Sequence, residues 1–259
     1  MKKNLYTQLL ADTLAGKKSF AILIDPDKYS LDSLSAVVQL AVNAGVDYFF
    51  FGGSLLMRDN QSRLINYIKE NTGIPVVLFP GNNMQLNNDA DSILLLSLIS
   101  GRNPDMLIGR HVIAAPYLKA SNLEILPTGY LLIECGHATA VTYMSNTTPI
   151  PAQKDDIAVC TAMAGEMLGM KLIYMDAGSG AANPVPGSMI TKVKGSIGLP
   201  LIIGGGITSP DLAREAFDAG ADVVVVGNAI EHDPGLISRI AAVRENVTRD
   251  HHKIVNRKF

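Results

Sequence analysis

Charged residues follow the first apolar segment of the chain in a pattern suited to phosphate chemistry. Residues 24–28 read Ile-Asp-Pro-Asp-Lys, at the end of an apolar run. Because Pro26 fixes the chain direction where that run ends, we expect Asp25 at the mouth of the fold and Lys28 just beyond it. Asp25 would hold Mg²⁺ and Lys28 would contribute a point charge, which suits a substrate with several phosphate oxygens. The alternative is a turn capped by the aspartate, since Asp-Pro is common in turns.

A hydroxyl group ends the next apolar run. Gly52-Gly53-Ser54 follows the aromatic run at residues 48–51. The hydroxyl of Ser54 would either complete the shell of a metal or phosphate, or cap the helix that follows. The residues alone leave both roles open.

Three glycine-rich segments in the last third of the chain carry the strongest signal. They are Asp176-Ala177-Gly178-Ser179-Gly180, Gly204-Gly205-Gly206 and Gly227-Asn228, and each follows an apolar run. Glycine lets backbone N–H groups approach an anion without a Cβ in the way, and the next helix presents the positive end of its dipole. One such cluster is equally well explained as a tight turn. Three of them at successive strand ends indicate a phosphate site.

Eight short apolar runs predict the strands that position these groups. Most are continuous rather than alternating in polarity, which is typical of parallel strands covered on both faces. Segments with helical spacing lie between them. We therefore predict that residues 1–259 form a single (β/α)₈ (TIM) barrel with a phosphate site at its C-terminal face; an open doubly wound sheet is the alternative. The predicted strands are residues 20–24, 48–51, 76–79, 93–96, 130–133, 172–175, 201–203 and 223–226.

The overall composition excludes several classes of function. The formal net charge is -2 and no basic run stands out, so we expect no nucleic acid as a partner. Cys135 and Cys160 have no ligand-like spacing, which excludes a cysteine zinc site and suggests a reducing compartment. Residues 1–10 lack the features of a signal peptide, and the strongest apolar run, residues 93–99, is too short to span a bilayer. We expect a soluble, cytoplasmic protein without a transmembrane segment.

Apolar residues gather in the first half of the chain. Residues 49–51, 79–82 and 93–99 would place hydrophobic surface along one side of the barrel. Most of these side chains must belong to the core. A lipid tail bound there would gain ~0.8 kcal/mol for each buried CH₂ group.

Taken together, these segments resemble the geranylgeranylglyceryl phosphate synthase family, which includes the bacterial heptaprenylglyceryl phosphate synthases. Many phosphate-binding barrels share the glycine segments alone. The combination of DPDK after the first strand, FPGN after the third and YxxAGSGA after the sixth is more specific. The matching segments cover the chain almost from end to end: AILIDPDK (21–28), FFFGGS (49–54), PVVLFPGN (75–82), TTPIP (147–151), YMDAGSGA (174–181), IIGGGITSP (202–210) and VVVVGNAIE (223–231).

The resemblance implies a Mg²⁺-dependent prenyltransferase. It would move a polyprenyl group, expected to be geranylgeranyl, from its prenyl diphosphate to the C3 hydroxyl of sn-glycerol 1-phosphate. The resemblance places the metal on Asp25 and Ser54. It also implies a homo-oligomer, either dimer or hexamer, and a lipid substrate or product that allows transient contact with a membrane surface. The residues placed against the glycerol phosphate are Tyr174, Met175, Asp176, Ala177, Gly178, Ser179, Gly180, Gly205, Gly206, Gly227 and Asn228.

Asp176 and Lys28 are the residues that we expect to be catalytic. Asp176 would accept the proton of the attacking hydroxyl. Many members of the family carry glutamate there, so the reach of this carboxylate is shorter by one methylene. The metal on Asp25 would act as a Lewis acid toward the departing diphosphate. The DDxxD signature of other prenyl diphosphate enzymes is absent, because Asp155-Asp156 continues as Ile157-Ala158-Val159.

Two other functions are compatible with the residues by themselves. One is an isomerase or aldolase that acts on a soluble phosphosugar and has no use for a lipid groove. The other is a non-catalytic protein that binds a phosphate ligand. Formation of product from a prenyl diphosphate and sn-glycerol 1-phosphate separates the prenyltransferase from both.

Overall fold

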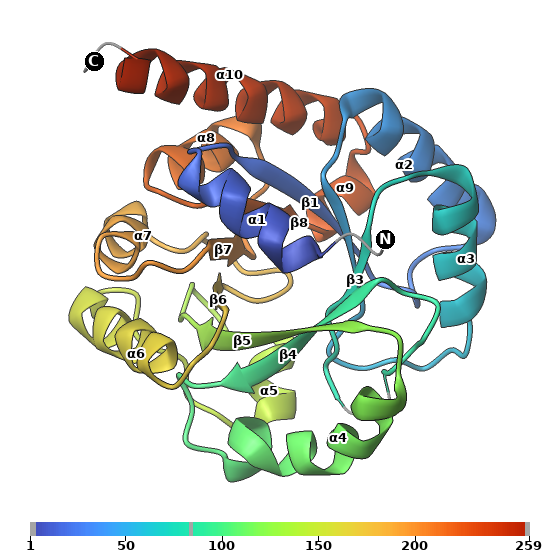
Figure 1. The fold of residues 1–259 in the computed structure, drawn as a ribbon, viewed down its shortest axis with the longest axis horizontal. Coiled ribbons are helices and arrows are strands. Elements are labelled where there is room, and N and C mark those ends of the chain that lie inside the picture. Colours follow the sequence, from blue (N-terminus) through green and yellow to red (C-terminus); the bar gives the residue numbers. More distant parts are fainter. Residues whose placement is uncertain (1–3, 83–84, 257–259) are drawn as a thin grey trace.

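Eight parallel strands close into a barrel in the order of the chain, as a computed structural model that describes residues 4–82 and 85–256 shows (Figure 1). The first strand pairs with the second and with the eighth, so the sheet has no free edge. This confirms the predicted (β/α)₈ barrel over the open doubly wound sheet. The strands are β1 (Ser19–Ile24), β2 (Tyr48–Phe51), β3 (Val76–Leu78), β4 (Ser92–Leu98), β5 (Glu124–Leu132), β6 (Leu172–Asp176), β7 (Leu201–Gly204) and β8 (Val223–Val226).

Helices surround the barrel and connect most pairs of successive strands, but the described residues between β3 and β4 form no helix (Figure 1). A π-helix, η1, leads directly into α4 in the long connection between β4 and β5. None of the helices among the described residues is long and apolar enough to cross a membrane. The helices are α1 (Leu5–Leu14), α2 (Leu31–Ala44), α3 (Gln61–Asn71), η1 (Asp105–Gly109), α4 (Arg110–Ala120), α5 (Ala140–Ser145), α6 (Asp155–Met167), α7 (Gly187–Lys194), α8 (Pro210–Asp218), α9 (Asn228–His232) and α10 (Leu236–Asn256).

Helix α2 shows how local sequence sets the helix bounds. Its N-cap, Ser30, accepts a hydrogen bond from the Ser33 backbone N–H, and the Ser33 hydroxyl accepts one from the Ser30 N–H. The helix ends at Gly45, whose φ of 64° is left-handed and costs glycine little. One stripe of the helix is buried against the barrel, at Leu34, Val37, Val38 and Ala41. The next strand therefore begins at the point where the sequence predicted it.

The core has two layers, because successive residues of a strand point to opposite faces of the sheet. Phe49 and Phe51 of β2 pack in the outer layer, between the strands and the helices. Phe50, between them, packs inside the barrel with Tyr174 and Val225. Burial on both faces explains why the strands read as continuous apolar runs.

Strands β4 and β5 differ most from the prediction. They form seven registered pairs, from Ser92↔Glu124 to Leu98↔Tyr130, so β5 begins well before the predicted residue 130. Pro127 and Gly129, which are poor strand formers, hide this extension in the sequence. On its other side β4 pairs with β3 at only two positions, Val77↔Ser92 and Leu78↔Ile93. The far half of β4 is therefore not covered by β3 at that edge.

Helix α1 closes the end of the barrel where the strands begin (Figure 1). Leu5 and Leu9 pack into the inner core layer. The carboxylate of Glu124, at the start of β5, accepts hydrogen bonds from the backbone N–H groups of Leu5 and Tyr6, at 2.6 and 3.0 Å. These are among the N–H groups that a helix cannot satisfy internally. The larger cavity opens at the opposite end of the barrel.

Replacing Glu124 by alanine is expected to lower the free energy of unfolding by about 1–2 kcal/mol, because two backbone donors lose their acceptor. Urea denaturation measures the change. Glu70→Ala, which alters an exposed glutamate of α3, is the matched control and should leave stability unchanged within about 0.5 kcal/mol. Equal midpoints for the two variants would contradict this role of Glu124.

Candidate active site

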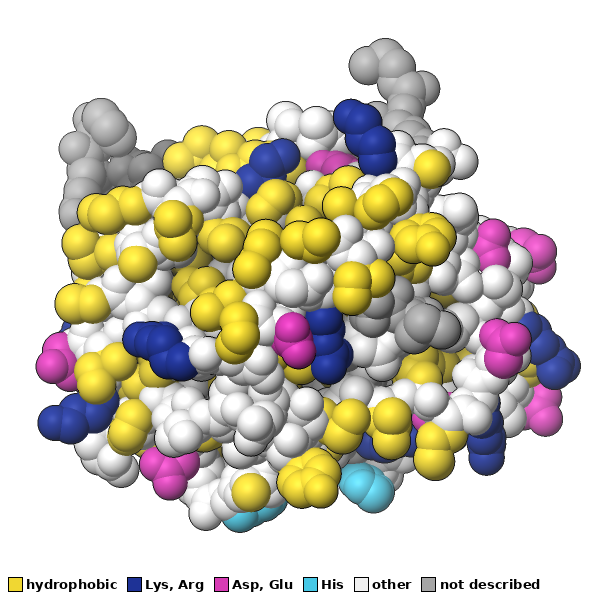
Figure 2. All heavy atoms as spheres, turned by 90° about the horizontal axis from the view of Figure 1, so that it is seen from below, with side chains coloured by type: hydrophobic (Ala, Val, Ile, Leu, Met, Phe, Trp, Pro, Cys, Tyr) yellow, Lys and Arg dark blue, Asp and Glu magenta, His cyan; other side chains and the backbone are white. Residues whose placement is uncertain are grey.

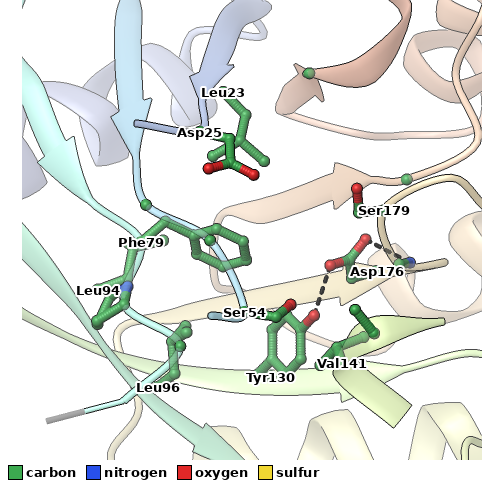
Figure 3. Close-up of a pocket in the computed structure, with 18 of the residues that line it drawn as sticks. Leu23, Asp25, Ser54, Phe79, Leu94, Leu96, Tyr130, Val141, Asp176 and Ser179 are labelled. Atoms are coloured by element: carbon green, nitrogen blue, oxygen red, sulfur yellow. Dashed lines mark hydrogen bonds between the residues drawn. The ribbon is translucent and has the colours of Figure 1, made fainter. Parts of the chain in front are cut away.

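A cavity of about 450 Å³ opens at the carboxyl ends of the strands. Its lining changes character from one side to the other. The loops that follow β1, β6, β7 and β8 contribute polar groups and glycines, whereas β4, η1, α4 and α5 contribute mostly apolar side chains. Figure 3 shows Asp25, Asp176 and Ser179 facing the same space as Phe79, Leu94 and Leu96. The cavity can therefore receive a polar and an apolar group together.

Asp176 ends β6 with its side chain inside the barrel mouth, where only 7 % of the residue is exposed. Its Oδ2 accepts a hydrogen bond from the Tyr130 hydroxyl at 2.5 Å, and its Oδ1 accepts one from the Gly178 N–H at 2.8 Å (Figure 3). Burial raises the pKa of Asp176 above its ordinary value, while these two hydrogen bonds act in the opposite direction. The carboxylate is thus a better proton acceptor than a solvent-exposed aspartate.

Aromatic rings hold the donor to this carboxylate. Tyr130 packs at tilted angles against Phe79 and Tyr174, with ring centroids 6.0 and 5.5 Å away. Phe79 and Tyr174 stack on each other at 5.1 Å. Burial raises the pKa of Tyr130 well above its ordinary value, and the charge of Asp176 acts in the same direction. The phenol is therefore neutral near neutral pH and donates its proton to the carboxylate.

Lys28 lies at the polar rim in a network of acceptors. Its Nζ donates to Asn228 Oδ1 at 2.9 Å and lies 3.1 Å from the Glu231 carboxylate. Asp25 is farther away, with Oδ2 at 3.9 Å. The hydroxyl of Ser179 donates to the same Asn228 oxygen at 3.0 Å. Residues that follow β1, β6 and β8 thus meet at one point, as the strand order predicted.

Asp25 and Ser54 lie on the rim next to this network. Asp25 is half-buried, and its Oδ1 accepts a hydrogen bond from the Asp27 N–H at 3.1 Å. Burial raises the pKa of Asp25 above its ordinary value. The hydrogen bond from the Asp27 N–H and the charge of Lys28 lower this pKa, whereas the charge of Glu231 adds to the rise. Gly53 packs against the carboxylate, since a Cβ there would lie 3.4 Å from Asp25 Oδ1 and Oδ2. Ser54 follows directly and lines the cavity.

Glycines with left-handed backbones shape the wall beside Asp176. Gly205 has a φ of 77°, and a Cβ there would lie 2.7 Å from both Asp176 Oδ1 and the Gly178 nitrogen. Gly178 itself has a φ of 89°, a conformation that residues with a side chain rarely adopt. Glycine is therefore required where the loops after β6 and β7 approach each other. The result is a concave wall of backbone that also includes Gly180, Gly206 and Gly227.

The apolar part of the cavity extends from inside the barrel to its outer layer. Leu94, Leu96 and Leu98 line it from the inner face of β4, and Ile93 and Leu95 line it from the outer face of the same strand. This passage lies at the edge where β4 runs past the end of β3. Met106 and Val141 add to the lining next to the inner core layer, whereas Leu86, Ala114 and Leu118 add to it next to the outer layer.

Carboxylates outnumber cations among the described residues of the lining. Asp25, Asp105, Asp176 and Glu231 carry acidic groups, whereas Lys28 and Arg110 carry basic ones. Lys28 is already paired with Glu231. An anion that enters beside Asp25 would therefore be repelled unless an additional cation accompanied it.

Comparison with protein families matches residues 13–246 of the chain to the PcrB family. The chain belongs to the PcrB family. Two of its similar relatives are geranylgeranylglyceryl phosphate synthases, from Spirosoma linguale and from Chitinophaga pinensis. The first is 53 % identical over 89 % of this chain and 92 % of the relative, and the second is 50 % identical over 93 % and 96 %. Membership confirms the resemblance inferred from the motifs and makes this chain a prenyltransferase.

A solved structure of the same kind supports the assignment. The (S)-3-O-geranylgeranylglyceryl phosphate synthase from Thermoplasma acidophilum, in complex with its substrate sn-glycerol-1-phosphate, superposes with a TM-score of 0.88 at 28 % identity. The match covers 93 % of this chain and 98 % of that one. The two chains therefore share one fold along nearly their whole length.

Most of the residues predicted for the site of this PcrB-family protein do line one cavity, and two do not. Met175 and Ala177 are buried in the outer core layer with their side chains turned away. The physical reason is strand alternation, which points Tyr174 and Asp176 inward and their neighbours outward. The predicted residues that line the cavity are Asp25, Lys28, Ser54, Tyr174, Asp176, Gly178, Ser179, Gly180, Gly205, Gly206, Gly227 and Asn228.

Several cavity residues were missed by the sequence analysis. Tyr130 was predicted only as part of a strand. It lies two residues before Leu132, which pairs with Asp176, so its side chain points into the barrel as those of Leu132 and Asp176 do. Glu231 stands three residues after Asn228, which places both on one face of the short helix α9. Arg110 donates to the Gly81 carbonyl oxygen at 3.3 Å, a contact between η1–α4 and the loop after β3 that no local pattern indicates.

Replacing Gly205 by alanine should disrupt the wall beside Asp176, because the new Cβ would overlap the carboxylate and the φ of 77° is strained for alanine. We expect the free energy of unfolding to fall by about 1–3 kcal/mol. Denaturant titration measures it, with Gly187→Ala as the control, since the nearest contact of a Cβ there is at 3.8 Å. Equal losses in both variants would show that the wall tolerates a side chain.

Proposed function

We propose that this PcrB-family enzyme transfers a geranylgeranyl or similar polyprenyl group from its diphosphate to the C3 hydroxyl of sn-glycerol 1-phosphate. The products would be diphosphate and an ether-lipid precursor. One observation carries the proposal: a single cavity joins a glycine-walled polar end, with a buried carboxylate, to an apolar end that continues outside the barrel. The names of the relatives and the ligand of the Thermoplasma acidophilum structure support it.

The polar end suits the glycerol phosphate. Backbone at Gly178, Gly180, Gly205, Gly206 and Gly227 lines this end of the cavity, and residues without side chains let peptide groups approach a phosphate closely. The hydroxyl of Ser179 lies on the same wall. A phosphate held there fixes one end of a small, flexible molecule. Its hydroxyls are then directed toward the buried carboxylate of Asp176.

The apolar end suits the prenyl chain. Side chains of β4, η1, α4 and α5 form a mostly hydrophobic lining from the barrel interior to the outer layer. Each buried CH₂ group of a prenyl chain would contribute ~0.8 kcal/mol, so this part would supply much of the affinity. The diphosphate then lies between the two ends, at the rim formed by Asp25, Lys28 and Ser54.

Mg²⁺ fits the rim by the chemistry of its donors. The Asp25 carboxylate and the Ser54 hydroxyl are oxygen ligands, and Mg²⁺ is commonly held by one or two carboxylates together with substrate phosphates. The excess of carboxylates in the lining is a second reason to propose Mg²⁺. The negative charge of Asp25 would repel a diphosphate unless a cation lay between them. When bound, the ion would stabilise negative charge on the departing diphosphate as a Lewis acid.

The chain's own residues position the acceptor and manage its proton. The glycine wall would orient the glycerol phosphate, which converts attack on the prenyl carbon into an effectively unimolecular step. Asp176 would receive the proton of the C3 hydroxyl, and a positioned base of this kind contributes ~10²- to 10⁴-fold. Lys28, held by Asn228 and Glu231, would place its charge near the diphosphate.

The two competing functions gain no support. An isomerase or aldolase of soluble phosphosugars has no use for the apolar end of the cavity, and neither does a protein that only binds phosphate. The curated relatives described above are all named as synthases. A direct test incubates the enzyme with prenyl diphosphates of several lengths and with both enantiomers of glycerol phosphate. Extractable ether product from the sn-1 enantiomer supports the proposal, and no product at any chain length overturns it.

Asp25→Asn is expected to lower kcat/KM at least about 100-fold, because the neutral amide is a poor Mg²⁺ ligand. Turnover measured against Mg²⁺ concentration tests this, and chelation of divalent ions should abolish wild-type turnover. Asp32→Asn, an exposed aspartate of α2, is the control. Wild-type activity of Asp25→Asn at limiting Mg²⁺ would remove the metal assignment.

We propose that the chain self-associates through the outer surface of η1 and α4. Ile108, Val112, Ile113 and Tyr117 are 58–69 % exposed there, while Ala114 and Leu118 on the inner side are buried. A helix that is apolar on both sides is normally covered on both. Figure 2, seen from the side where α4 and α5 lie, shows hydrophobic side chains spread across this face. Basic residues nearby are too few for the polybasic clusters that bind membranes.

Ile113→Glu combined with Tyr117→Glu is expected to convert the oligomer to a monomer, because two charges would be buried at the interface. Light scattering after size-exclusion chromatography measures the mass. Met167→Glu, which alters an exposed methionine of α6, is the control. A wild-type monomer that floats with lipid vesicles would instead assign this face to the membrane contact expected from the resemblance.

A further inference from the structure

The hydrogen bond between Tyr130 and Asp176 is the shortest polar contact described within the cavity. The Tyr130 hydroxyl lies 2.5 Å from Asp176 Oδ2, both residues are buried, and both line the cavity (Figure 3). They come from neighbouring strands, β5 and β6, with Leu132 registered opposite Asp176. The distance is that of a charge-assisted O–H···O⁻ hydrogen bond.

Asp176 has a protein donor on each of its carboxylate oxygens. Oδ1 accepts the Gly178 N–H and Oδ2 accepts the Tyr130 hydroxyl. Gly205 also packs against Oδ1, since a Cβ there would lie 2.7 Å away. A substrate hydroxyl therefore meets a carboxylate that is already surrounded. The phenol oxygen of Tyr130, by contrast, donates one hydrogen bond and keeps lone pairs free to accept another.

The ring of Tyr130 has little freedom to leave this position. Phe79 and Tyr174 pack against it, and they stack on each other. Tyr130 is only 4 % exposed, although it lines the cavity. A phenol fixed between a carboxylate and the cavity has the geometry of a proton relay.

We propose that Tyr130 is a catalytic residue that relays the proton of the acceptor hydroxyl to Asp176; this rests on the proposed prenyl transfer. As the C3 oxygen forms its bond to the prenyl carbon, the hydroxyl proton passes to the phenol oxygen and the phenol proton passes to Asp176 Oδ2. The bond between the prenyl carbon and the diphosphate oxygen breaks, and its electron pair leaves with the diphosphate. The step ends with a neutral phenol and a protonated Asp176.

Two features of the pair favour this relay. The phenol is never required to exist as a free phenolate, because it gains one proton as it gives up another. Burial raises the pKa of Asp176, which makes the final, protonated carboxyl group easier to form. The phenol also spans the distance between the acceptor hydroxyl and the carboxylate, since the aspartate side chain is one methylene shorter than a glutamate would be at the same position.

A proton inventory on the wild-type enzyme tests the relay without any substitution. Single-turnover rates of ether formation are measured by rapid quench in mixtures of H₂O and D₂O. Two protons in flight give a rate that bows below a straight line as the D₂O fraction rises. A straight line, from a single moving proton, overturns the relay while leaving the prenyltransferase proposal intact. Absence of ether product would overturn the proposed function itself.

Substitutions test the same point independently. Tyr130→Phe keeps the ring and is expected to lower the single-turnover rate about 100-fold, with little change in the KM of either substrate. Its proton inventory should become linear. Tyr48→Phe, which removes a buried phenol at the opposite end of the barrel, is the control and should retain full activity. A Tyr130→Phe rate within threefold of wild type overturns the proposal.

A second carboxylate variant distinguishes a relay from a purely structural phenol. In the Tyr130→Phe background, Asp176→Glu extends the carboxylate by one methylene toward the position of the removed hydroxyl. We expect the single-turnover rate of this double variant to be at least tenfold higher than that of Tyr130→Phe, because the longer side chain can contact the substrate hydroxyl directly. Failure of this rescue, with the double variant folded by circular dichroism, would contradict the role of Tyr130 as a bridge.

Discussion

The burial of one carboxylate in the wall of the barrel mouth constrains much of the surrounding structure. An ionised aspartate removed from water is costly unless hydrogen bonds replace its hydration. Asp176 obtains them from Tyr130 and from the Gly178 backbone. To bring that backbone close, Gly178 and Gly205 adopt conformations that need glycine. The stacked rings of Phe79 and Tyr174 in turn fix the phenol. One buried carboxylate therefore accounts for residues on β5 and β6 and in the loops after β3, β6 and β7.

The cavity has a polar end and an apolar end because the strands differ in length. β3 meets β4 at only two registered pairs, whereas β4 and β5 share seven. Past the end of β3, leucines from both faces of β4 become accessible from the cavity. A closed barrel normally keeps its inner and outer core layers apart. Here the short third strand joins them, and helices η1 and α4 cover the opening from outside.

The charge balance of the cavity is set by contacts among the chain's own residues. Lys28 is held by Asn228 and Glu231 at the polar rim. Asp25 is half-buried, and burial raises its pKa above the ordinary value. In the proposed reaction, a phosphate and a cation would exchange these contacts for new ionic ones.

Sequence by itself determined the barrel, the end of the barrel that carries the candidate site and most of the residues of its glycine wall. Periodicity and glycine placement are local properties, and parallel strands bring consecutive strand ends to one face. Strand alternation, also a local rule, could have excluded Met175 and Ala177 beforehand. The partnership of Tyr130 with Asp176, the pairing of Lys28 with Glu231 and the passage beside β4 were decided only by the tertiary structure. Each depends on the register between strands and on packing between residues far apart in the chain, which no local pattern specifies.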